Sequence, residues 1–89
     1  MARVVIWGAG ASRDMDRLAG GIPKMIPAIV EFIYRPLAEN PARVGTPLIG
    51  ELEGSHKAVV GAYRVEYSFT DTTVTIEHVD HRADVYRRR

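Results

Sequence analysis

The sequence predicts an α+β domain in which an N-terminal strand and a helical hairpin pack on a small antiparallel sheet. Two observations carry this prediction: apolar residues recur with a helical period in the first half of the chain and alternate with polar residues in the second half. Because the chain has only 89 residues, residues 1–89 are predicted to form one domain around one core.

The first predicted elements are a strand and a short helix. Residues 3–7 are rich in β-branched side chains, which is typical of a buried strand. Residues 12–18 are predicted to form a helix capped by Ser12, with Asp14 in its first turn. The Gly-Gly pair that follows is expected to end this helix.

The clearest helical period lies in residues 22–39. Pro23 suits the first position of a helix, and Pro36 is expected to kink or end it. The predicted apolar stripe consists of Ile22, Met25, Ile26, Ile29, Val30, Ile33 and Leu37. This second helix completes the predicted hairpin, whose apolar stripe packs on the sheet.

The second half of the chain is predicted to be irregular over 40–55 and then to form three strands, at 56–60, 63–70 and 74–79. The four-residue turn between the last two strands sets a register. The expected pairs are Phe69–Val74, Tyr67–Ile76, Val65–His78, Arg64–Val79 and Glu66–Glu77. Since Glu66 and Glu77 would repel each other, Arg64 is expected to relieve them.

Composition narrows the functional classes. The chain has 12 basic and 11 acidic residues and a net charge of +1, a weak electrostatic signature for a nucleic-acid-binding protein. It lacks cysteine, which excludes disulfides and thiolate metal sites and favours a cytoplasmic location. No apolar run is long enough to span a membrane, so no membrane partner is expected.

Three possible sites are weak. The Gly8-Ala9-Gly10 turn resembles the start of a dinucleotide-binding fold, but Arg13 stands where the third glycine belongs. His78 and His81 lie three residues apart and would point to opposite faces of a strand, which disfavours a metal site. No serine has a convincing base beside it. We therefore expect neither a metal nor a cofactor.

The remaining candidates are basic side chains on the sheet face opposite the helices, here called the outer face. Lys57, Arg64, Arg82 and Tyr86 are predicted to converge there. Such cations suit a phosphodiester, because they stabilise charge that develops on the phosphate oxygens. The alternative is that the arginines only neutralise neighbouring carboxylates.

The chain also resembles the RelE/ParE toxin superfamily over nearly its whole length, with the most specific motifs in its second half. The resemblance rests on a P-L-x-G-x-L-E-G run at 47–54, on Y-R-V-x-Y at 63–67 and on the segment ending H-R-A-D-V-Y at 79–86. It implies a microbial-RNase-like α+β fold and, for a RelE-like member, the toxin of a type II toxin–antitoxin module. Such a toxin is an endoribonuclease that cleaves mRNA in the ribosomal A site, where a ribose 2′-OH attacks the adjacent phosphate.

The resemblance also implies roles for particular residues. Arg64 would hold the phosphate, Arg82 would stabilise the transition state and Tyr86 would orient or stack on the RNA. Lys57 would act as a base or an electrostatic partner. His81 and Arg87 are expected to contact the substrate.

Some residues depart from the family pattern. Val59 and Val60 stand where many relatives have a basic pair, and Glu66 and Glu77 add negative charge near Arg64. These departures keep two alternatives open: a ParE-like toxin that binds DNA gyrase, and an attenuated toxin that mainly binds its antitoxin.

The resemblance implies partners as well. They are a cognate antitoxin protein and the ribosome with its A-site mRNA. DNA would be contacted only indirectly, through the antitoxin.

Overall fold

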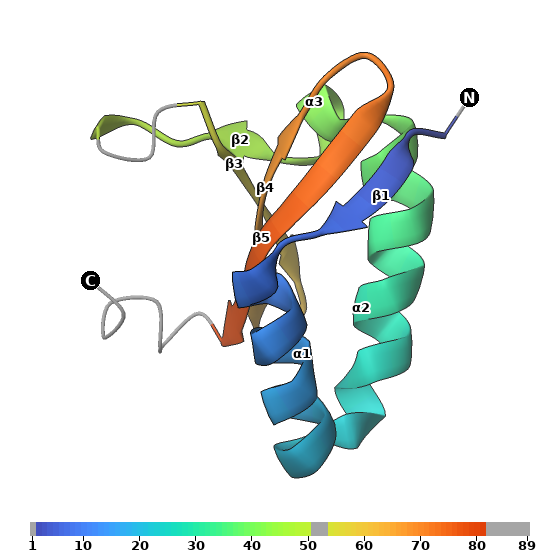
Figure 1. Cartoon of the computed structure of the whole chain (residues 1–89), viewed down its shortest axis with the longest axis vertical. Helices are drawn as coiled ribbons and strands as arrows, with labels where there is room; N and C mark the ends of the chain where they lie inside the picture. The colour runs from blue at the N-terminus through green and yellow to red at the C-terminus, as the bar shows by residue number, and fades with distance from the viewer. Residues whose placement is uncertain (1, 51–53, 82–89) are drawn as a thin grey trace.

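The computed structural model describes residues 2–50 and 54–81, which fold into one layer of helices on a five-stranded sheet (Figure 1). The helical segments are α1 (Ala9–Gly21), the 3₁₀ turn η1 (Pro23–Met25), α2 (Ile26–Phe32), the π-helical segment η2 (Ile33–Leu37) and α3 (Pro41–Val44). The strands are β1 (Val4–Trp7), β2 (Thr46–Pro47), β3 (His56–Val60), β4 (Tyr63–Phe69) and β5 (Thr73–His81). The predicted α+β class is confirmed.

The sheet is mixed. Its strand order is β1-β5-β4-β3-β2, with β1 parallel to β5 and every other neighbouring pair antiparallel. The expectation of an entirely antiparallel sheet was therefore wrong for its first strand. All the helical segments from α1 to α3 lie between β1 and the remaining strands in the sequence, and a long connection of this kind allows the first strand to lie parallel to the last one.

Helix α1 begins earlier than predicted. Gly8 occupies the N-cap position, its N–H donates to the Ile76 carbonyl at 2.9 Å, and the Ser12 N–H donates to the Gly8 carbonyl at 3.0 Å. Ser12 is therefore inside the helix and does not cap it. Asp14 also lies beyond the first turn, and its side chain contacts β5.

The helix predicted over 22–39 is one nearly continuous helical run, assembled from η1, α2 and η2. Pro36 lies inside η2 and does not end the run. A proline clashes with an α-helical turn and lacks an N–H, and the wider π-helical turn accommodates both defects. The apolar stripe is confirmed at Ile29, Ile33 and Leu37, which are fully buried, whereas Ile22 is exposed.

Two short elements lie in the region predicted to be irregular. Helix α3 follows Asn40, and β2 pairs with the start of β3 at the sheet edge. Pro47 is tolerated in β2 because an edge strand needs fewer backbone donors.

A β-bulge in β5 changes the predicted register. The pairs Phe69–Val74 and Tyr67–Ile76 are as expected, but the register shifts by one residue between Glu66 and Tyr67. The pairs beyond the shift are Glu66–His78, Val65–Val79 and Arg64–Asp80, so the expected partners of Glu66, Val65 and Arg64 were wrong.

The physical reason for the bulge is the core. With Glu77 as the extra residue, Val79 pairs with Val65 and is fully buried on the helix side of the sheet. A regular strand would have put the His78 imidazole in that position instead. The bulge thus exchanges a polar side chain for an apolar one in the core and moves His78 to the outer face.

Tyr67 anchors the segment around α3 to the sheet. Its side chain is fully buried, and its hydroxyl donates a hydrogen bond of 2.6 Å to the Pro41 carbonyl. Gly45 passes so close that a Cβ atom there would overlap the Tyr67 hydroxyl and the Lys57 carbonyl. Burial raises the pKa of the Tyr67 phenol from 10.0 to about 12.

We predict that Tyr67→Phe lowers the free energy of unfolding by about 1–3 kcal/mol at pH 7, because the buried Pro41 carbonyl loses its donor. The raised pKa means that the neutral phenol stabilises the fold fully below pH 10. That contribution is lost as the pH rises from 10 towards 12. The difference between wild type and variant should therefore shrink over this interval, as measured by urea unfolding at pH 7, 10 and 11.5. If the difference in unfolding free energy between wild type and variant did not change with pH, the stabilising role of the neutral Tyr67 phenol would be contradicted.

Candidate functional site

The outer face of the sheet brings together two of the predicted site residues. Lys57 pairs with Glu66, and Arg64 pairs with Val59 on one side and Asp80 on the other. The intervening residue Val65 is fully buried on the helix side, so these polar side chains share the opposite face. Lys57 and Arg64 therefore lie on neighbouring strands of one surface, as the sequence predicted.

Arg64 is held close to the sheet. Its side chain is only 14% exposed, and its Nη2 atom lies 3.4 Å from the Glu66 carboxylate. The expected ion pair between Arg64 and Glu66 is therefore present, although the opposed Glu77 that was its reason is not. The Nε atom of Arg64 is buried and has no hydrogen-bond partner within the described ranges. A buried N–H donor without an acceptor is suited to an anionic ligand.

Glu77 does not oppose Glu66. Its carboxylate accepts a hydrogen bond of 2.7 Å from the Ser55 hydroxyl, on the far side of β4. Repulsion between the two glutamates is thus avoided by the bulge, which places His78 opposite Glu66.

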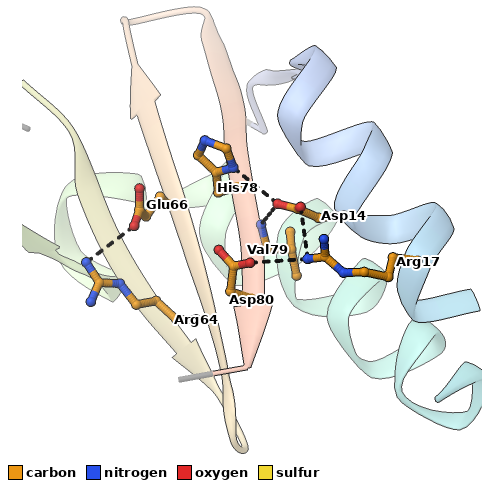
Figure 2. Close-up of polar contacts among 7 residues, drawn as sticks. All are labelled: Asp14, Arg17, Arg64, Glu66, His78, Val79 and Asp80. Carbon is orange, nitrogen blue, oxygen red and sulfur yellow. Dashed lines mark hydrogen bonds and ion pairs between the residues drawn. The ribbon is translucent and has the colours of Figure 1, made fainter. Parts of the chain in front are cut away.

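A second polar cluster joins α1 to β5, as Figure 2 shows. Asp14 accepts from the Val79 N–H at 2.9 Å and lies 3.2 Å from Nδ1 of His78. Arg17 contacts Asp14 at 3.1 Å and Asp80 at 3.4 Å. The cluster is held in place by close packing, because a Cβ atom at Gly10 would lie 2.7 Å from the His78 ring.

Asp14 supplies a hydrogen-bond acceptor at a part of the β5 edge where no neighbouring strand lies. Strand β1 pairs with β5 only as far as Trp7–Ile76, and the chain then turns into α1. The Val79 N–H would consequently be a buried donor without an acceptor, which costs about 1–3 kcal/mol. The Asp14 carboxylate replaces the missing strand at this point.

His81 lies on the other side of the sheet from His78. Its ring packs edge-on against Tyr63 with centroids 5.4 Å apart. It borders a cavity of about 270 Å³ between the end of α1 and β5, whose walls include Leu18, Ile22, Tyr63 and Val79. The two histidines point to opposite faces as predicted, but His78 takes the outer face and His81 the helix side.

Arg82, Tyr86 and Arg87 lie outside the described residues. Of the predicted site, the structure therefore places Lys57 and Arg64 together and His81 apart from them. The site roles of all six residues stay predictions.

Asp14, His78 and Asp80 could each offer a ligand atom to a metal ion, since these atoms lie within 4.8 Å of one another. Arg17 already pairs with both carboxylates, and Val79 donates to Asp14. These contacts identify the group as an ion-pair cluster between α1 and β5, and we assign no metal to it.

Sequence reasoning missed the contacts that Asp14, Arg17 and His78 make with one another and with Asp80. The only local signal for them is a break in alternation, since Ile76 and Val79 are both apolar although three residues apart. The contact between Asp14 and Val79 spans 65 residues of sequence.

Comparison with known proteins gives close relatives over most of the chain. Toxin RelG of Mycobacterium tuberculosis is 48% identical over 80 residues, covering 88% of this chain and 88% of the relative. Toxin RelE of the same organism is 44% identical over 81 residues, covering 89% of this chain and 80% of the relative. No protein-family model matches the chain.

The crystal structure of the toxin–antitoxin complex RelBE2 from M. tuberculosis contains a similar fold. The TM-score is 0.83 at 40% sequence identity, and the match covers 91% of this chain and 99% of that one. Within the described residues, no helix combines the length and apolar character needed to cross a membrane.

We predict that Asp14→Ala lowers the free energy of unfolding by about 2–4 kcal/mol, because it leaves the Val79 N–H without an acceptor, removes the carboxylate that contacts His78 and removes one of the two carboxylates that pair with Arg17. The matched control is Asp16→Ala, an exposed aspartate of the same helix, which should change stability by less than about 0.5 kcal/mol. Urea unfolding at pH 7 measures both. Equal effects of the two substitutions would contradict the edge-capping role.

Proposed function

The chain belongs to the family of RelE-like toxins, and from that premise we propose that it cleaves mRNA on the ribosome as the toxin of a type II toxin–antitoxin module. The observation that carries the proposal is the placement of Lys57 and Arg64 on one sheet face, where the buried Arg64 Nε has no hydrogen-bond partner among the described residues.

In the proposed reaction the ribose 2′-oxygen attacks the adjacent phosphorus and the bond to the 5′-oxygen breaks. Negative charge grows on the non-bridging phosphate oxygens as the transition state forms. Arg64 would hold these oxygens, with its position fixed by Glu66, and Lys57 would add positive charge from the neighbouring strand. Fixed cations of this kind lower the barrier because they need no reorganisation during the reaction.

The residues after β5 complete the proposed site. Arg82 would stabilise the transition state, Tyr86 would orient or stack on the RNA, and Arg87 would contact the backbone. His81 faces the helix side of the sheet, so we propose a contact with flanking RNA for it and not with the reacting phosphate.

One feature of the outer face favours attenuated cleavage as a second candidate. Val59 pairs with Arg64 and is 59% exposed, so an apolar side chain stands beside the candidate phosphate site. Each cation missing from such a face weakens binding to RNA through counterion release. The first alternative is therefore a weak nuclease whose main activity is binding its antitoxin. The second is a non-nucleolytic toxin that binds gyrase.

We propose a cognate antitoxin as the partner, because the similar RelBE2 structure is a toxin–antitoxin complex. The ribosome with its A-site mRNA is the proposed target, in the cytoplasm. DNA would be reached only through the antitoxin.

The test is primer extension on an mRNA translated in a cell-free system, with a ribosome-free control. Wild-type protein should produce cuts within A-site codons only when ribosomes are present. Arg64→Ala should reduce cleavage about 100-fold or more, the usual effect of removing a group that stabilises an oxyanion.

The matched control is Arg35→Ala. Arg35 is an exposed arginine of the helical layer whose ion pair in the described part of the chain is with the exposed Glu31, so cleavage should stay within about twofold of wild type. Intact mRNA with folded wild-type protein would overturn the nuclease proposal. Equal loss in both variants would show that Arg64 has no special role.

A further inference from the structure

The β5 bulge places an imidazole on the proposed catalytic face. His78 is the cross-strand partner of Glu66, and Glu66 is in turn the partner of Lys57, so the three form one row across β5, β4 and β3. Adjacent strands lie about 4.8 Å apart, and the row therefore spans about 10 Å. One nucleotide can bridge this row, with its phosphate at Lys57 and Arg64 and its ribose beside His78.

His78 is also more accessible than the carboxylates of Glu66, Asp14 and Asp80. Its side chain is 33% exposed, whereas those of Glu66, Asp14 and Asp80 are between 4% and 7% exposed. Glu66 is occupied by its ion pair with Arg64, which gives it a positioning role. His78 is therefore an imidazole of this face that is both partly exposed and held by a buried carboxylate.

Asp14 fixes the ring of His78. The Asp14 carboxylate already accepts from the Val79 N–H and from Arg17, so it acts as an acceptor towards Nδ1 of His78 as well. Nδ1 therefore carries the proton, and in the neutral ring Nε2 has the free lone pair. A carboxylate behind an imidazole in this way selects the tautomer and stabilises the imidazolium that forms on proton uptake.

We propose that His78 is the general base of the RNA cleavage, and that Asp14 is its positioning residue. This inference rests on the proposed nuclease function. The 2′-OH proton passes to Nε2 of His78 as the bond between the 2′-oxygen and phosphorus forms and the bond to the 5′-oxygen breaks. The 5′-oxygen takes a proton from water, and the resulting hydroxide takes the proton back from the imidazolium.

Within the described residues, the charged groups near His78 come from α1, β3, β4 and β5. They are Asp14 and Arg17 of α1, Lys57 of β3, Arg64 and Glu66 of β4, and Glu77 and Asp80 of β5. A general base acts only in its unprotonated form. The rate of cleavage should therefore rise with pH and level off once the base is deprotonated.

The test is single-turnover cleavage of mRNA on purified, programmed ribosomes between pH 5.5 and 8.5. His78→Gln should lower the rate at pH 8 about 100-fold or more and abolish the rise with pH. His56→Gln is the matched control, since the His56 ring packs against Phe69 on the helix side of the sheet, and it should retain the rise. Asp14→Asn should lower the rate at least about tenfold, whereas Asp16→Asn should not. Thermal unfolding of each variant checks that it is folded.

The outcomes separate the two proposals. If wild-type protein leaves the mRNA uncut, the nuclease function and this inference both fail. If wild type cuts and His78→Gln keeps the rise with pH, only the inference fails.

A readout that does not depend on activity is the ¹⁵N spectrum of the wild-type histidines at pH 8. It should show His78 protonated at Nδ1. Protonation at Nε2 would overturn the role proposed for Asp14 and His78.

Discussion

The unpaired edge of β5 is the constraint on which the site depends. Strand β1 ends at Trp7, so the backbone N–H groups on that side of β5 beyond Ile76 need hydrogen-bond acceptors from elsewhere in the protein. Helix α1 supplies one through Asp14, which binds the Val79 N–H. Because α1 must then lie against β5, its Arg17 reaches Asp80 and its Asp14 reaches His78. The need for an acceptor at the Val79 N–H thus determines the polar contacts between α1 and β5.

The bulge at Glu77 is the second half of the same arrangement. It keeps Val79 in the core and turns His78 outwards, where it joins Lys57 and Arg64. Bulges commonly re-aim side chains near active sites. Here a change in register of one residue provides both a well-packed core and an imidazole on the outer face. The low net charge of +1 is therefore compatible with a phosphate site, because Lys57, Arg64 and the His78 imidazole lie on one surface.

The sequence was sufficient for the parts that depend on local periodicity. The apolar stripe through Ile29 and Ile33, and the register from the turn as far as Tyr67–Ile76, followed from spacing alone. The placement of Lys57 and Arg64 on one face followed from alternation along neighbouring strands.

The remaining features could not be predicted because they depend on distant contacts or on small local distortions. In the sequence, the bulge is visible only as a break in the apolar alternation at Val79. The acceptor for the Val79 N–H is Asp14, which lies 65 residues earlier in the chain. The predicted helix end at Pro36 was wrong because of such a local distortion, since a π-helical turn accommodates a proline that would end an α-helix. Membership in the RelE-like toxins rests instead on motifs and on relatives that match most of the chain.

The most direct test of the account is the structure of the wild-type protein on a ribosome whose mRNA carries a 2′-O-methyl group at the cleavage site. We predict that the scissile phosphate lies on the outer face, within about 3 Å of the Arg64 guanidinium, with the blocked 2′-oxygen next to Nε2 of His78. An mRNA that runs along the helical layer, or a phosphate remote from Arg64, would contradict it.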